Sequence, residues 1–99
     1  MIHVTALKQK NSFYLKIKGK SLKNRKIYSK IETLYNALLS LAERDGRVIR
    51  LKGRTDKRVM RLAVTGGVHT EGAFNMVLQG IREMERKHPK YIAFNERMI

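Results

Sequence analysis

The feature that most constrains the fold of this chain is a change in the period of its apolar residues. In residues 2–8 and 12–18, apolar and polar side chains alternate, as they do on strands with one buried face. A polar turn at residues 9–11 joins the two stretches, so we expect a β-hairpin. From Ile31 to Ala42 the apolar residues recur every three or four positions, which is the stripe of an amphipathic helix.

The same change of period is repeated further along the chain. The elements expected after the hairpin are a helix from about Ser29 to Asp45, strands at 47–52 and 58–64, a helix at 71–87 and a strand at 91–94. Ser29 and Glu32 match a capping box, and Pro89 ends the second helix. The order β-β-α-β-β-α-β in 99 residues predicts one α+β domain spanning residues 1–99. We expect a two-layer sandwich in which two helices pack on one face of a sheet.

Charge is the most informative part of the composition. The net charge is +14, from 22 Lys and Arg residues against 8 Asp and Glu residues, and the first acid along the chain is Glu32. A domain this basic attracts polyanions such as nucleic acids. The sequence has no cysteine, which excludes disulfides, thiolate metal sites and cysteine nucleophiles. We expect no metal, no cofactor and no membrane span, and therefore a cytoplasmic protein.

The cations fall into two groups that we expect to contact a polyanion. The first group lies, with the aromatic Tyr14, on the sheet face that the helices leave open: Lys16, Lys18, Arg50, Lys52 and Arg61. The second lies in a basic loop at residues 18–30, KGKSLKNRKIYSK, and comprises Lys18, Lys20, Lys23, Arg25 and Lys26. Arg25 can bind a phosphate with two hydrogen bonds, and Tyr14 can stack on a base. A solvated loop without a partner is the alternative for residues 18–30.

The chain resembles the ribosomal-processing cysteine protease (Prp) family along nearly its whole length. The resemblance is carried by the opening MIHV, by IKGK before the loop, by IYSKIETL at the first helix and by EMERKHPKYIAF near the end. In that family a Gly-His at the end of the second strand and a Cys at the start of the first helix provide the catalytic pair, which trims a ribosomal protein.

Carried over to this sequence, the resemblance keeps Gly19 but changes both catalytic positions. Lys20 stands at the position of the His, and Tyr28 stands at the position of the Cys. A cysteine protease needs a thiolate activated by a nearby base, and this pair supplies neither group. The resemblance therefore implies an inactive, highly basic relative, of a kind often encoded by phages, and we expect no enzyme.

Two functions remain open from the sequence. The first is a nucleic-acid-binding protein that uses the cationic sheet face and the 18–30 loop, driven by backbone charge and shape rather than by base sequence. The alternative is a protein-interaction module that blocks or titrates an acidic host or ribosomal protein. RNA is favoured over DNA because the resemblance points to ribosome biology. The resemblance also implies a homodimer, which a charge of +14 opposes unless a patch is well buried.

Overall fold

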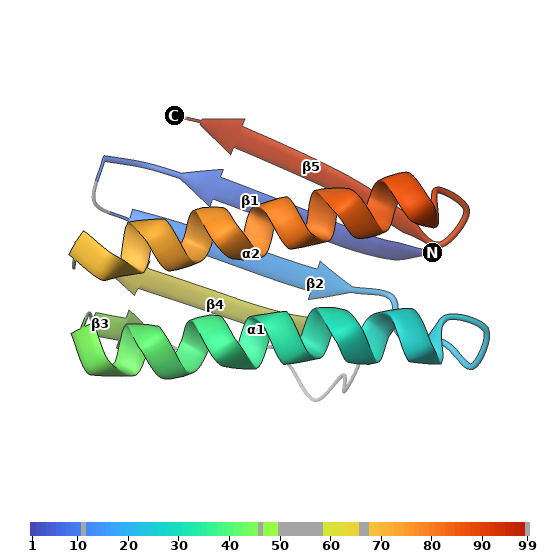
Figure 1. The fold of residues 1–99 in the computed structure, drawn as a ribbon, viewed down its shortest axis with the longest axis horizontal. Helices are drawn as coiled ribbons and strands as arrows, with labels where there is room; N and C mark the ends of the chain where they lie inside the picture. The colour runs from blue at the N-terminus through green and yellow to red at the C-terminus, as the bar shows by residue number, and fades with distance from the viewer. Residues whose placement is uncertain (11, 46, 50–58, 66–67, 99) are drawn as a thin grey trace.

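Two helices cover one face of a five-stranded sheet (Figure 1). The computed structural model describes residues 1–10, 12–45, 47–49, 59–65 and 68–98. The elements are β1 (Ile2–Lys8), β2 (Ser12–Lys18), α1 (Arg25–Asp45), β3 (Arg47–Ile49), β4 (Val59–Thr65), α2 (Val68–Lys87) and β5 (Ile92–Met98). The strand order is β3-β4-β2-β1-β5, with only β5 and β1 parallel among these pairs. The predicted element order and two-layer α+β sandwich are confirmed.

The core lies between the two layers and is built from alternate strand residues. Leu15 on β2 is fully buried between Ala6 on β1 and Leu62 on β4, its partners in the register. Burying one such side chain is worth about 1.5–3 kcal/mol relative to leaving it exposed. The two helices approach closely at Gly80, where an added Cβ would lie 3.2 Å from Cδ1 of Leu34. The helices are therefore packed against each other as well as against the sheet.

The first helix begins at Arg25, earlier than the capping box at Ser29 indicated. The carbonyl of Asn24 accepts the first helical hydrogen bond from the Tyr28 N–H, at 2.8 Å. Ser29 lies inside the helix, where its carbonyl accepts a hydrogen bond from Thr33 Oγ1. Residues 18–30 are therefore not one loop, because only residues 19–24 connect β2 to α1.

The second helix begins at Val68 instead of residue 71. The sequence spacing predicts a buried stripe of Ala73, Met76, Val77, Gly80, Ile81 and Met84, in which Met76 is wrong. Phe74 and Leu78 are buried, whereas Met76 is 74% exposed. The buried residues recur at intervals of three and four from Thr70, so the apolar stripe of α2 is rotated relative to Met76. Met76 contributes to the outer surface and not to the core.

The last strand is longer than the short run expected at residues 91–94. β5 pairs in parallel with β1 from Ile2–Ile92 to Lys8–Met98. Its second half contains Asn95, Glu96 and Arg97, which give no apolar alternation. An edge strand with one open face needs few apolar residues, so backbone pairing with β1 defines this part of the strand.

Candidate nucleic-acid interface

The sheet has an open face, on the side opposite the helices. We define it by the described residues that alternate with the core positions: His3, Thr5, Leu7, Ser12, Tyr14, Lys16, Lys18, Val59, Arg61, Ala63, Thr65, Ala93, Asn95 and Arg97. Among these described positions there are four Lys or Arg residues and no acid. The open face is therefore cationic, as the sequence predicted.

Strand register arranges the open-face cations in rows across the sheet. Lys16 is directly opposite Arg61 on one side and Thr5 on the other. Lys18, in the next row, is opposite Val59 and His3. Like charges directly opposite each other on neighbouring strands destabilise a sheet, because their side chains are about 5 Å apart at Cβ. The Lys16–Arg61 pair is thus a site where an anion would relieve repulsion.

Arg61 combines a restrained backbone with an incompletely satisfied side chain. Its carbonyl accepts a hydrogen bond from the phenol of Tyr35 on α1, at 2.9 Å. Its Nε atom is buried and has no hydrogen-bond partner among the described residues. Because this Nε is buried, a phosphate from solvent would bind the terminal nitrogens of the guanidinium, which can donate to two oxygens.

Tyr14 lies in the third row of the open face, opposite Ala63 and Leu7. Its side chain is half-buried beside a hollow of about 290 Å³. The hollow is lined by Leu7, Gln9, Ser12, Phe13, Tyr14, Ala63, Val64 and Thr65. An aromatic ring among small and apolar neighbours, one row from Lys16, can take part in base stacking.

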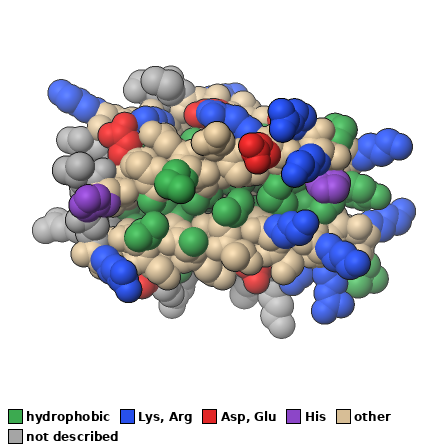
Figure 2. Space-filling view, in the orientation of Figure 1, with side chains coloured by type: hydrophobic (Ala, Val, Ile, Leu, Met, Phe, Trp, Pro, Cys, Tyr) green, Lys and Arg blue, Asp and Glu red, His purple; other side chains and the backbone are tan. Residues whose placement is uncertain are grey.

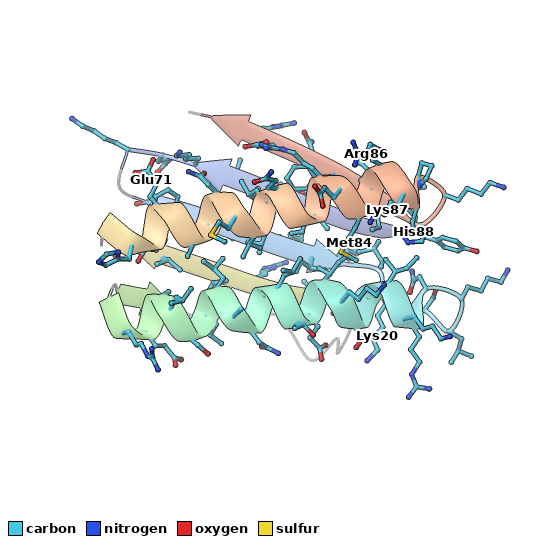
Figure 3. The ribbon with its side chains drawn as sticks, viewed as in Figure 1. Lys20, Glu71, Met84, Arg86, Lys87 and His88 are labelled. Carbon is cyan, nitrogen blue, oxygen red and sulfur yellow. The ribbon has the colours of Figure 1, made fainter. Side chains whose placement is uncertain are left out.

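The predicted site residues do not form one surface. Four of them lie on the open face: Tyr14, Lys16, Lys18 and Arg61. The other predicted site residues that the structure describes lie at one end of the molecule, around the start of α1: Lys20, Lys23, Arg25 and Lys26. Arg50 and Lys52 are outside the described residues. We call this second region the cationic end: Lys20, Lys23, Arg25, Lys26, Lys30, Arg86, Lys87 and Lys90. Figure 3 shows Lys20 near the start of α1, Lys87 and His88 near the end of α2, and Arg86 on the side of α2 nearer to β5.

The side chain of Asn24 fixes the connection from β2 to α1 through two hydrogen bonds. Asn24 is 2% exposed, and its Oδ1 accepts a hydrogen bond from the Ser21 N–H at 2.7 Å. Its Nδ2 donates to the Gly19 carbonyl at 3.0 Å. Gly19 has φ +112°, and a Cβ there would lie 2.2 Å from the Met1 carbonyl oxygen. These contacts place Lys20 and Lys23 at the cationic end instead of beside Lys18 on the sheet.

The two positions that the resemblance assigns to a catalytic pair are in contact. Lys20 Nζ is 5.4 Å from the centroid of the Tyr28 ring. Tyr28 is buried in the core, so it packs and does not present its ring to a ligand. Burial raises the pKa of the Tyr28 phenol, and the nearby Glu32 and Tyr35 raise it further.

A cavity of about 550 Å³ opens at the cationic end, between the start of α1 and the connection from α2 to β5. It is lined by Leu22, Lys23, Asn24, Arg25, Lys26, Ile27, Lys30, His88 and Tyr91. We call it the end cavity. Leu22 is 91% exposed and Tyr91 39% exposed, so apolar surface adjoins the cations. Figure 2 shows Lys and Arg side chains gathered around this end.

Sequence reasoning missed three features of these surfaces. His3 and Arg97 lie on the open face, and period-two alternation from Ile2 would have located His3. Arg97 was missed because the last strand was expected to end at residue 94. The end cavity depends on how α1 meets residues 88–91, which no local pattern indicates.

Metal ligands and membrane spans were searched for in the described residues. No group of three or more His, Cys, Asp or Glu residues that could hold a metal occurs there. In the same part of the chain, no helix is long and apolar enough to cross a bilayer.

Comparison with known proteins gives matches by structure alone. No family model and no curated protein matches the sequence. SMU.848 from Streptococcus mutans superposes with a TM-score of 0.83 and 16% identity, over 100% of this chain and 99% of that one. The essential ribosomal processing protease Prp from S. aureus, in complex with a substrate peptide, superposes with a TM-score of 0.70 and 12% identity, over 98% and 100%. The fold is Prp-like. Prp with a covalently linked product peptide gives 0.69 and 11% over the same shares.

These matches contradict our expectation that the chain is not an enzyme. Two of the three structures belong to a protease with its substrate or product peptide bound, so this fold carries catalysis in another protein. Composition and charge therefore do not exclude enzymatic activity for a chain of this architecture. At 11–16% identity, what the chains share is the fold.

Proposed function

We propose that this protein binds nucleic acid on the open face of its sheet, through backbone charge and shape instead of base sequence. The observation that carries the proposal is the Lys16–Arg61 pair, two cations opposite each other on neighbouring strands, with Lys18 in the adjacent row. No acid among the described open-face residues neutralises them. A phosphate backbone laid across these rows would remove the repulsion and release its own counterions.

Aromatic and polar groups on the same face support a single-stranded ligand. Tyr14 lies beside a hollow, one row from Lys16, and an aromatic ring next to a cationic row is the combination that sequence-tolerant single-strand binding uses. RNA is favoured over DNA by analogy, since a structure with this fold belongs to a ribosomal processing protease.

A fluorescence-anisotropy titration tests the proposal. Labelled single- and double-stranded RNA and DNA oligomers are titrated at several salt concentrations. We expect log–log salt slopes of several units, at about 0.7 per phosphate on single strands and 0.9 on duplexes. Negligible binding of every oligomer at about 150 mM salt would overturn the proposal.

Matched charge reversals locate the surface. Lys16→Glu with Lys18→Glu removes two open-face cations, whereas Lys10→Glu with Arg44→Glu lowers the net charge equally at the hairpin turn and at the end of α1. We expect the first variant to lose most of its affinity for every oligomer and the second to lose little. Equal losses in the two variants would mean that net charge alone, and not the open face, attracts the ligand.

An acidic protein is the competing partner. Such a partner would depend on a few apolar or aromatic anchors, and Leu22 and Tyr91 are the exposed candidates that adjoin the cationic end. Binding that survives the open-face reversal but fails in Leu22→Ser would identify this second kind of partner.

A further inference from the structure

We propose that the end cavity binds a terminal phosphate group of a nucleic-acid strand, that is, a 5′- or 3′-phosphomonoester. This inference rests on the proposed function and adds to it a preference for phosphorylated strand ends. The cavity, of about 550 Å³, falls within the range of small-molecule sites. It is also separate from the open face, whose residues it does not include.

The charge of the lining suits a phosphomonoester better than an internal phosphodiester. Lys23, Arg25, Lys26 and Lys30 all line the cavity, and no acid is among its lining residues. A terminal phosphate carries about −1.5 to −2 charges at neutral pH and three strong acceptor oxygens. An internal phosphodiester carries one negative charge per nucleotide, so it would leave most of these cations without a counter-ion.

The hydrogen-bond donors that line the end cavity are of two kinds, one guanidinium and several ammonium groups, and together they suit one phosphate group. Arg25 offers a planar fork that can bind two oxygens at once, and the lysines supply point charges around it. Arg25 and Lys26 occupy the first turn of α1, which contains no acid. These side chains project from a helix whose start is held by the buried Asn24, so their backbones are in defined positions.

The apolar part of the lining suits the terminal nucleoside. Tyr91 is 39% exposed, and its backbone is fixed because its carbonyl accepts a hydrogen bond from the Ile2 N–H at 2.7 Å. A partly exposed ring on a fixed backbone is a surface on which a terminal base can stack. His88 and Leu22 extend this surface around the same cavity.

The open face leads towards the end cavity. Lys16 and Lys18 lie about 6.6 Å apart along β2, since alternate residues of a strand share a face. β2 ends at Lys18, and the next residues enter the connection that carries Lys20 and Lys23. A nucleic-acid strand that follows β2 from Tyr14 to Lys18, across the rows, therefore leaves the open face at the cationic end (Figure 1).

The test compares oligomers that differ only at their ends. RNA oligomers of one sequence with a 5′-phosphate, a 3′-phosphate or hydroxyls at both ends are titrated by anisotropy at about 150 mM salt. An oligomer one nucleotide longer with hydroxyl ends controls for added charge. We expect one phosphorylated form to bind about tenfold or more tightly than both hydroxyl forms.

Two matched variants assign the preference to the cavity. Arg25→Gln with Lys26→Gln removes two lining cations, and Arg86→Gln with Lys87→Gln removes two cations of the same end that do not line it. We expect the first variant to lose the preference for phosphorylated ends and the second to keep it. Tyr91→Leu should reduce affinity for phosphorylated oligomers while leaving the salt slope unchanged.

Several outcomes would overturn the inference. Equal affinity for phosphate and hydroxyl ends, with steep salt slopes retained, would reject the end-cavity site and leave the open-face function standing. A preference that persists in the Arg25→Gln, Lys26→Gln variant would place the site elsewhere. If a Glu-rich peptide bound at the end cavity through Tyr91, and the protein showed no preference among oligomer ends, the cavity would be assigned to an acidic protein. Absence of binding by any oligomer would reject the proposed function as well.

Discussion

The ammonium group of Lys20 lies over the ring of Tyr28, 5.4 Å from its centroid. Tyr28 is held in the core by α1, whereas Lys20 follows the sharp bend at Gly19. The contact therefore joins the connection after β2 to the buried side of the first helix. These are the two positions that the resemblance in the sequence assigns to a catalytic pair. The contact keeps the positive charge of Lys20 at the cationic end.

The raised pKa of Tyr28 predicts a loss of stability at high pH. Burial, with Glu32 and Tyr35 nearby, raises this pKa above that of the unfolded chain, near 10. The folded state therefore keeps a proton that the unfolded state releases. This contribution is complete below about pH 10 and is lost as the pH rises through the folded pKa. Urea midpoints measured from pH 8 to 11 should fall more steeply for the wild type than for Tyr28→Phe. Parallel curves would show that Tyr28 does not titrate differently on folding.

Replacing Lys16 by Glu should stabilise the protein while weakening nucleic-acid binding. The new carboxylate would face Arg61 across the strands and turn a repulsive pair into an attractive one. Cross-strand pairs of this kind are worth about 0.2–1 kcal/mol. Urea denaturation should show a higher free energy of unfolding for Lys16→Glu than for the neutral control Lys16→Gln, and anisotropy should rank their affinities in the reverse order. A destabilised Lys16→Glu variant would contradict the repulsion between Lys16 and Arg61.

Two glycine substitutions should change stability in opposite directions. At Gly19 an alanine would require an unfavourable φ and place its Cβ 2.2 Å from the Met1 carbonyl oxygen. We expect Gly19→Ala to cost about 1–3 kcal/mol or more. At Gly72, inside α2, an added Cβ meets nothing within 4 Å, and we expect a gain of about 0.5–1 kcal/mol from helix propensity. Urea unfolding of the two variants beside the wild type tests both values, and a neutral Gly19→Ala would remove the role given to this bend.

Removing the Glu85 side chain should promote self-association. Its Oε2 accepts a hydrogen bond from the Phe94 N–H on the edge strand β5. Without that acceptor the edge presents a free donor to another strand. Sedimentation velocity should show dimers or larger species for Glu85→Ala but not for Glu85→Gln, which changes the charge equally and keeps an amide oxygen. Identical behaviour of the two variants would indicate that charge, and not this hydrogen bond, controls association.

Alternation and helical periodicity were sufficient to predict the sheet, the two helices and the open-face positions of Tyr14, Lys16, Lys18 and Arg61. They failed where tertiary contacts decide the boundary. α1 begins at Arg25 because Asn24 closes the connection with its side chain and starts the helix with its carbonyl. The capping box at Ser29 was an equally good local signal for a helix start, but the contacts of Asn24 decide where α1 begins. β5 extends to Met98 because β1 offers a partner for every residue, a contact between segments far apart in the chain.

The pairing of β5 with β1 also affects the order in which the protein can be completed during synthesis. β1 is made first, yet one of its edges has no partner until residues 92–98 have left the ribosome. Up to that point the nascent chain carries an open strand edge beside the hairpin, a situation that favours pairing with other chains. Addition of β5 is thus the event that gives β1 its second partner and moves the sheet edge to a strand whose Phe94 N–H is already bonded to Glu85.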